Sequence, residues 1–285
     1  MKIDNIFICP QCQAEVQWSE KQNSYNCPHC QKKFPITDGY IDFYPEYQAA
    51  ANLGQRTMES NSIINIYESD KFRGSKIMTW GFQISLDQEL ELINQIAQPG
   101  SKDMILDLAS GPGLFARMFA QKEQNRNVFA FDLSRQMLSW GAQKAASENL
   151  GNLSFVHGDA HRLPFKDETF NVVNATGAIH NFADVHKAFA ETSRVMKPGG
   201  RFTFSVVLNR NTLYTKAASW FYKTFFSVHF FSVEEMSSRL REAGFEPTIY
   251  HAQGVWMIGV GIKNDHRGAA ADGSDAERSE QGKDE

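Results

Sequence analysis

Long apolar runs and an excess of one charge are both missing from this sequence. Nowhere among its 285 residues do eighteen uncharged apolar residues follow one another, so we expect no membrane-spanning helix and no membrane insertion. The opening residues, MKIDNIFICPQCQ, lack the apolar stretch and cleavage pattern of a signal peptide, and we therefore expect a cytoplasmic protein. Lys and Arg number 29 and Asp and Glu 33. The chain thus has no basic excess of the kind that favours nucleic acid as a partner.

Cysteine is scarce and confined to one place. The four cysteines, Cys9, Cys12, Cys27 and Cys30, form two CPxC turns separated by fourteen residues. A single CxxC would be compatible with a redox pair, but two in tandem present four thiolates that suit a tetrahedral Zn²⁺ site. Four thiolates leave no open coordination position, so we expect a structural zinc ion in a ribbon spanning residues 1–45.

A glycine turn follows an apolar run at DLASGPGLF, residues 107–115. Gly111 and Gly113 allow the backbone to approach a ligand closely, and their spacing also fits a dinucleotide fingerprint. Asp107 separates the alternatives, because a carboxylate at the end of the strand would repel a pyrophosphate. It would suit S-adenosylmethionine (SAM), which has no phosphate and carries an ammonium and a sulfonium group.

Two further strand ends carry acids. Asp132 ends the next apolar run and is placed to accept both ribose hydroxyls, as it would for either SAM or NAD. Asp159 and Ala160 follow the third run, where the carboxylate and the backbone amide could recognise an adenine. These residues predict an adenosine-containing ligand at the ends of three strands.

The order of the apolar runs predicts an α/β fold. Short runs such as MILDLA, NVFAFD and FNVVNAT alternate with helical patterns from residue 99 onward, as in βαβ units. Before them, Ser85 begins a helix whose apolar stripe contains Leu86, Leu90, Ile93 and Ile96, and residues 246–263 fit an antiparallel pair at the sheet edge.

The motifs D-x-A-x-G-x-G, G-D-A-x-x-L-P-F and SRVMKPGGRF, in this order, resemble class I SAM-dependent methyltransferases, and residues 60–262 are covered by the resemblance. The chain is most similar to ubiquinone/menaquinone-type enzymes and to a plastid and bacterial group with an N-terminal cysteine-rich segment. The resemblance implies a Rossmann-like seven-stranded sheet in the order 3-2-1-4-5-7-6, with strand 7 antiparallel. The expected cofactor residues are Asp107, Ala109, Gly111, Gly113, Asp132, Leu133, Met137, Asp159, Ala160 and Thr176.

Four regions follow from this interpretation. The predicted zinc ribbon occupies residues 1–45, and a helical linker or substrate lid occupies residues 46–98. The methyltransferase domain occupies residues 99–263. Residues 264–285, which lack aromatic and large aliphatic side chains, are expected to be a disordered tail.

The sequence says less about the molecule that receives the methyl group than about the cofactor. His180 follows the fourth strand and is a candidate base for a hydroxyl or an acidic carbon, although a histidine at a helix start can also serve packing alone. No N/D-P-P-Y/F motif is present, which disfavours methylation of adenine-type amino groups. Aromatic segments favour a small hydrophobic or aromatic substrate, bound by Tyr67, Trp80, Trp220, Phe226 and His229.

Two other functions fit the same residues. A cysteine-rich ribbon before a SAM domain is similar to the layout of bacterial 23S rRNA guanine-N1 methyltransferases, but residues 1–45 hold four Lys and five acids rather than a basic excess. The ribbon would otherwise be a packing module that shapes the substrate entrance. A non-catalytic SAM-binding protein is the second alternative.

Overall fold

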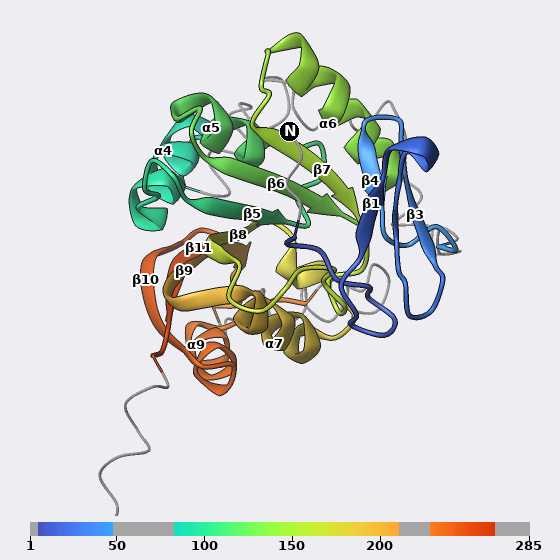
Figure 1. Ribbon diagram of the computed structural model, residues 1–285. Helices are drawn as coiled ribbons and strands as arrows, with labels where there is room; N and C mark the ends of the chain where they lie inside the picture. The colour runs from blue at the N-terminus through green and yellow to red at the C-terminus, as the bar shows by residue number, and fades with distance from the viewer. Residues whose placement is uncertain (1–4, 48–82, 211–228, 266–285) are drawn as a thin grey trace, which may run out of the picture.

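One mixed sheet of eleven strands forms the centre of the molecule (Figure 1). The computed structural model describes residues 5–47, 83–210 and 229–265. The strands from residue 99 onward are β5 (Met104–Leu108), β6 (Asn127–Asp132), β7 (Leu153–His157), β8 (Phe170–Thr176), β9 (Met196–Val207), β10 (Phe245–Gln253) and β11 (Trp256–Lys263).

These seven strands confirm the predicted strand order. They are arranged as β7-β6-β5-β8-β9-β11-β10, which is 3-2-1-4-5-7-6 in chain order. The first five pair in parallel, whereas β11 pairs antiparallel with both β9 and β10. The predicted antiparallel pair at the sheet edge is therefore also confirmed.

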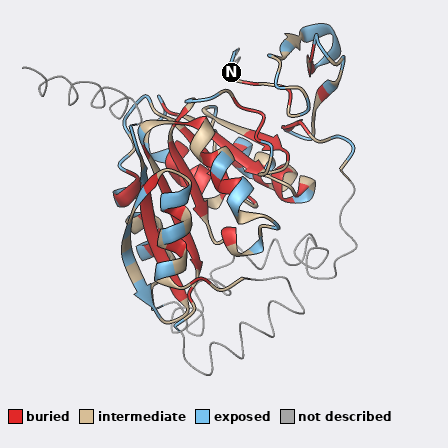
Figure 2. Cartoon of the chain, turned by 90° about the horizontal axis from the view of Figure 1, so that it is seen from below, coloured by how far each residue is buried: buried red, intermediate tan, exposed pale blue. Residues whose placement is uncertain are grey.

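Helices cover both faces of the sheet (Figure 1). One face packs against α4 (Leu86–Ala97), α5 (Leu114–Lys122) and α6 (Arg135–Ser147). The other packs against α7 (Val185–Val195) and α9 (Val233–Glu242), with the short 3₁₀ helix η2 (Ile179–Asn181) after β8. Figure 2 shows the strands as the most buried part of the chain, as expected for a sheet covered on both faces.

Helix α4 begins where the sequence predicts. The Ser85 hydroxyl accepts from Gln88 N, and the Gln88 side chain accepts from Ser85 N, which completes a capping box. Ile93 and Ile96 of the predicted stripe are buried, but so is Glu89. Its carboxylate accepts from Trp256 Nε1 at 2.9 Å, which explains how a charged residue is accommodated on the apolar face.

Residues 5–47, which we call the N-terminal module, add four strands to the predicted sheet. They contain β1 (Gln17–Ser19), η1 (Glu20–Gln22), β2 (Ser24–Asn26), β3 (Lys33–Thr37) and β4 (Tyr40–Asp42). Strands β1 to β4 form antiparallel pairs in succession, and β4 pairs in parallel with β7. The sheet thus differs from a seven-stranded one because β4 occupies the edge that β7 would otherwise expose.

The module also shares a core with the rest of the chain. The Phe7 ring lies 5.4 Å from Phe165 and 6.2 Å from Phe129, centre to centre. Backbone bonds run from Ile8 N to Pro164 O and from Lys166 N to Ile6 O. The module is consequently joined to the sheet by both packing and backbone hydrogen bonds.

Part of the predicted domain organisation lies outside the described residues. Residues 48–82 of the predicted lid and residues 266–285 of the predicted tail are not among the residues described. Within the ranges described, no helix is both long and apolar enough to cross a membrane.

Candidate active site

The carboxyl ends of β5, β6, β7 and β8 meet at one edge of the sheet. Because these strands are neighbours and parallel, the residues that follow them are brought together from distant parts of the sequence. Asp107, Asp132, Asp159 and Thr176 occupy this edge, each at or just beyond the end of its strand. The sheet therefore gathers the predicted cofactor residues as parallel order requires.

The glycine turn between β5 and α5 adopts left-handed backbone conformations. Ala109, Gly111 and Gly113 have φ angles of 53°, 54° and 79°. A Cβ on Gly113 would lie 3.1 Å from the Phe155 ring, and one on Gly111 would lie 3.3 Å from the Met137 sulfur. Glycine is required at Gly113 both by its backbone and by its contact with β7.

Asp107 lies beneath this turn and is only 2% exposed. Its Oδ2 accepts from Ala116 N in α5 at 2.9 Å, and its Oδ1 accepts from the Asn174 amide at 2.7 Å. Burial raises the pKa of the Asp107 carboxyl to about 7. The carboxyl group thus connects β5, α5 and β8, and its charge state is sensitive to any ligand bound nearby.

Asn174 is a site residue that the sequence analysis did not select. It is fully buried in β8, and its Oδ1 accepts from the hydroxyls of Thr176 (2.8 Å) and Thr203 (2.9 Å) while its amide donates to Asp107. Thr176 is therefore hydrogen-bonded to Asn174, the residue that donates to Asp107. The available signal was an asparagine between Val173 and Ala175 in the strand FNVVNAT.

Asp132 connects the glycine turn to the next loop. Its Oδ2 accepts from Gly111 N at 2.7 Å and its Oδ1 accepts from Ser134 N at 2.8 Å. Burial raises the pKa of this carboxyl group as well. Leu133 follows it directly and is partly exposed, while Met137, in the first turn of α6, is buried against the glycine turn.

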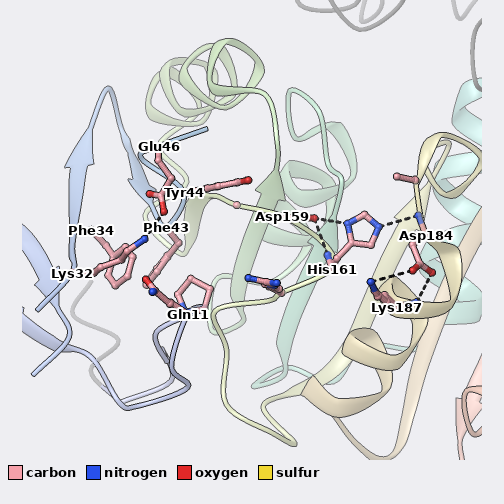
Figure 3. A pocket seen from close by; sticks show the side chains of 14 residues that line it. Gln11, Lys32, Phe34, Phe43, Tyr44, Glu46, Asp159, His161, Asp184 and Lys187 are labelled. Carbon is pink, nitrogen blue, oxygen red and sulfur yellow. Dashed lines mark hydrogen bonds and ion pairs between the residues drawn. The ribbon is translucent and has the colours of Figure 1, made fainter. Parts of the chain in front are cut away.

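Asp159 forms a compact polar group with two later residues (Figure 3). Its Oδ1 accepts from His161 N at 2.9 Å and from His161 Nδ1 at 2.6 Å. The other ring nitrogen of His161 accepts from Asp184 N at 3.2 Å. The bond to Asp159 raises the pKa of His161. Ala160, between them, is partly exposed, so its amide borders this group.

A cavity of about 860 Å³ lies beside Asp159 (Figure 3). One wall comes from the N-terminal module, including Phe34, Phe43 and Tyr44, and the other from Gly158, Asp159 and the start of α7. The glycine turn does not line it. The cavity therefore lies between the N-terminal module and Asp159, the residue predicted to recognise adenine.

His180 stands in η2 after β8. Its Nδ1 is buried and has no hydrogen-bond partner among the residues described. Burial lowers the pKa of the ring to about 4, so His180 is neutral near pH 7. Its ring centre lies 6.2 Å from that of Trp256.

His229 is brought next to His180, as the backbone N of His229 donates to the carbonyl of His180 at 2.8 Å. The His229 ring packs on Phe231 and its Nε2 lies 3.0 Å from Glu235 Oε1. The other predicted substrate residues, Tyr67, Trp80, Trp220 and Phe226, lie outside the described residues.

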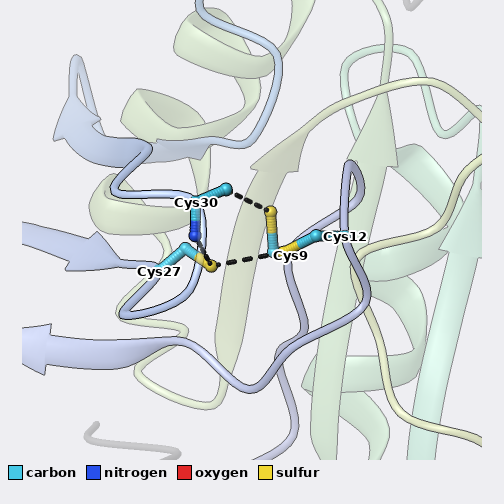
Figure 4. Close-up of side chains that lie close together, drawn as sticks. All are labelled: Cys9, Cys12, Cys27 and Cys30. Carbon is cyan, nitrogen blue, oxygen red and sulfur yellow. Dashed lines mark hydrogen bonds between the residues drawn. The ribbon is translucent and has the colours of Figure 1, made fainter.

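The four cysteines converge at one point of the module (Figure 4). All four sulfur atoms lie within 4.8 Å of one another, with Cys9 and Cys30 at 3.5 Å and Cys12 and Cys27 also at 3.5 Å. These separations are too long for disulfides and near the roughly 3.8 Å between sulfurs of a tetrahedral zinc–thiolate site. The cluster therefore fits a tetrahedral metal ion.

The two CPxC turns have matching backbone geometry. Gln13 N donates to Cys9 O at 2.8 Å and Gln31 N donates to Cys27 O at 3.0 Å. Gln13 and Gln31 both have φ angles of 61°. The same turn thus presents a cysteine pair from each side of the cluster.

Comparison with known proteins agrees with this geometry. Residues 106–204, from β5 to β9, match the family model described as a methyltransferase domain. An uncharacterized chloroplastic methyltransferase of Arabidopsis thaliana is 25% identical over 77% of this chain and 66% of its own length. The ubiquinone/menaquinone biosynthesis C-methyltransferase of Rickettsia massiliae is 38% identical over 39% of this chain and 46% of its own. The chain thus spans less than two thirds of the length of these curated relatives.

Solved structures share the fold. The phosphoethanolamine N-methyltransferase 2 of Haemonchus contortus, in complex with SAM, superimposes with a TM-score of 0.59 at 16% identity, covering 82% of this chain and 62% of that one. The family match lies on the strands and turns that form the candidate site. Residues 106–204 thus match a methyltransferase domain, and part of the chain is similar to ubiquinone/menaquinone-type C-methyltransferases.

Proposed function

We propose that this protein transfers a methyl group from SAM to a small hydrophobic or aromatic molecule, by O- or C-methylation. The observation that carries the proposal is a pair of carboxyl groups, the buried Asp107 and the partly exposed Asp132, at neighbouring strand ends against a glycine turn. Both have raised pKa values because they are desolvated, and the charge of Asp132 contributes to the rise at Asp107. A ligand with positive charge would stabilise both ionised forms.

This charge distribution favours SAM over a dinucleotide. The ammonium and sulfonium groups of SAM are attracted to such a site, whereas a pyrophosphate over the glycine turn would face Asp107. In this proposal Asp132 would accept from the ribose hydroxyls, and Asp159 with Ala160 would recognise the adenine. Ala109, Leu133, Met137 and Thr176 would complete the walls of the cofactor site.

The neutral His180 is the proposed base. When bound, SAM supplies an electrophilic methyl group on a good leaving group, so the protein must mainly orient the acceptor and receive one proton. The unpaired Nδ1 of His180 is available for a hydrogen bond to an acceptor hydroxyl or an acidic C–H. His229, fixed beside it, would contact the same acceptor.

The surroundings of His180 favour an apolar acceptor. Trp256 and Phe231, the rings packed on His180 and His229, are almost completely buried. These core rings make the environment behind the two histidines apolar and keep water from that side of the proposed base.

RNA is less favoured as the acceptor. Lys32 of the module forms an ion pair with Glu46, and Lys166 beside the module pairs with Glu15. Both cations therefore have carboxylate partners within the protein, and the net charge is −4. A ribbon that binds phosphates would carry unneutralised basic groups.

We further propose that the cysteine cluster binds Zn²⁺ as a structural ion. Cys9, Cys12, Cys27 and Cys30 would supply all four ligands, which leaves no position for substrate. The ion would fix the two CPxC turns from which β1 to β4 depart.

The test is transfer of a radiolabelled methyl group from SAM to a panel of lipophilic phenols and quinols. We expect a product with the wild type, a fall in kcat of about 100-fold for His180→Asn, and little change in KM for SAM. His186→Asn is the matched control, because His186 is an exposed histidine on α7. Labelling of rRNA but of no small molecule would support the RNA alternative, and SAM binding without any transfer would support a non-catalytic protein.

A further inference from the structure

The N-terminal module is in backbone contact with the strand that leads to the proposed cofactor site. Tyr40, Ile41 and Asp42 of β4 pair with Phe155, Val156 and His157 of β7. Phe43 N then donates to His157 O at 3.0 Å. The pairing therefore extends to the last residue of β7, immediately before the segment predicted to recognise adenine.

A buried side-chain link continues from β4 across β7 to the loop after β6. The Asp42 carboxylate lies 2.6 Å from His157 Nδ1, and His157 Nε2 lies 3.0 Å from the carbonyl oxygen of Leu133. Asp42 is 5% exposed and His157 fully buried. A carbonyl oxygen and a carboxylate both accept, so each ring nitrogen of His157 faces a hydrogen-bond acceptor. Burial raises the pKa of Asp42, but the bond and charge of His157, the bond from Tyr44 N and the charge of Arg135 together outweigh burial, so the pKa lies below its ordinary value.

This link ends beside Asp132, the residue proposed to bind the ribose. Leu133 directly follows Asp132, whose backbone carbonyl accepts from Gly158 N at 3.1 Å. The end of β6 at Asp132 and the loop that follows it are thus held from the β7 side by two hydrogen bonds, one from Gly158 N and one from His157. Displacing this loop would move the Asp132 carboxylate relative to Gly111 and the ribose position.

A second contact reaches the same loop from the module. Arg135, in the first turn of α6, donates to the carbonyl oxygens of Tyr44 (3.0 Å), Pro45 (2.9 Å) and Tyr47 (3.1 Å). Its Nε also lies 3.3 Å from Asp42 Oδ2. Residues 42–47 therefore hold the loop that follows Asp132 on both sides, at Leu133 and at Arg135.

We propose that the N-terminal module positions the ribose-binding acid of the SAM site, with Asp42, His157 and Arg135 as its positioning residues. None of the three contacts the cofactor in this proposal; they act by fixing the loop that carries Asp132. The inference rests on the proposed function, because it requires SAM to bind at Asp132. It assigns to the module a role in cofactor affinity in addition to any role at the substrate entrance.

Calorimetric titration with S-adenosylhomocysteine of the full chain, saturated with zinc, tests this proposal. We expect Kd to rise about tenfold for Asp42→Ala and for Arg135→Met, since each removes a charged group that links the module to the region around Asp132. Arg135 is partly exposed, so Arg135→Met remains informative even if Asp42→Ala fails to fold. Glu15→Ala is the matched control, because Glu15 joins the module to Lys166 through an exposed ion pair, and its Kd should stay within about twofold.

A double-mutant cycle separates positioning from general destabilisation. If Arg135 acts through Asp132, then Arg135→Met combined with Asp132→Asn should bind no more weakly than Asp132→Asn alone. Wild-type affinity in both single variants, or fully additive losses in the cycle, would overturn the proposal. Absence of binding to the wild type would instead refute the proposed function and with it the premise of this inference.

Discussion

Asp107 shows how a single buried carboxyl group can serve the fold and the proposed site together. It links β5, α5 and β8 through Ala116 and Asn174, and its pKa lies near 7 because it is desolvated. The sequence indicated a carboxylate at this strand end, since an acid after an apolar run is unusual. Its bonding partners were not predictable, because Asn174 is 67 residues away and meets it only through the pairing of β5 with β8.

The raised pKa of Asp107 predicts pH-dependent cofactor binding. In the ligand-free fold the acid form persists to about pH 7, whereas in the unfolded chain it ionises near 4. This group therefore lowers the stability of the free protein as pH rises from about 4 to about 7. An ammonium ligand requires the carboxylate, so affinity should rise as pH increases from 5.5 to 7 and then level off.

Titration with S-adenosylhomocysteine at pH 5.5, 6.5 and 7.5 measures this dependence. We expect Asp107→Asn to bind more weakly and to lose most of the pH dependence. Equal slopes for the variant and the wild type would show that another group titrates.

At the scale of elements, the connection between β5 and α5 depends on its glycines. Gly113 combines a φ of 79° with close contact to Phe155, whereas a Cβ on Gly151 would meet nothing within 4 Å. We expect Gly113→Ala to lower the free energy of unfolding by about 1–3 kcal/mol, and Gly151→Ala to change it by less than about 1 kcal/mol. Urea denaturation of both variants provides the comparison. Equal stabilities would contradict the strain assigned to this turn.

The elements of the methyltransferase domain were largely predictable, but the attachment of the module was not. Apolar runs separated by helical patterns identify β5 to β9 because buried parallel strands leave this signal. Strand β4 has three residues, too few for periodicity to show which strand it joins. The link from Asp42 through His157 to Leu133 depends on that pairing, so it was also invisible in the sequence.

At the scale of the whole molecule, the cysteine cluster is expected to maintain the entire N-terminal module. Cys9 and Cys27 are buried in the same core as Phe7 and Phe43, so disorder at the metal site would reach the β4–β7 pairing. We expect one Zn²⁺ per chain, and we expect Cys27→Ser to lower its occupancy and the thermal midpoint of unfolding. Metal analysis, near-ultraviolet circular dichroism and thermal unfolding measure these effects. A fully folded protein with no bound metal would contradict the structural role.

The central claim is that the edge formed by β5, β6 and β7 binds SAM, and its most direct test is calorimetry with S-adenosylhomocysteine and NADH. We predict micromolar binding of S-adenosylhomocysteine to the wild type and to Asp87→Ala, an exposed acid on α4, and loss of binding in Asp132→Ala. Binding of NADH in place of S-adenosylhomocysteine would contradict the account.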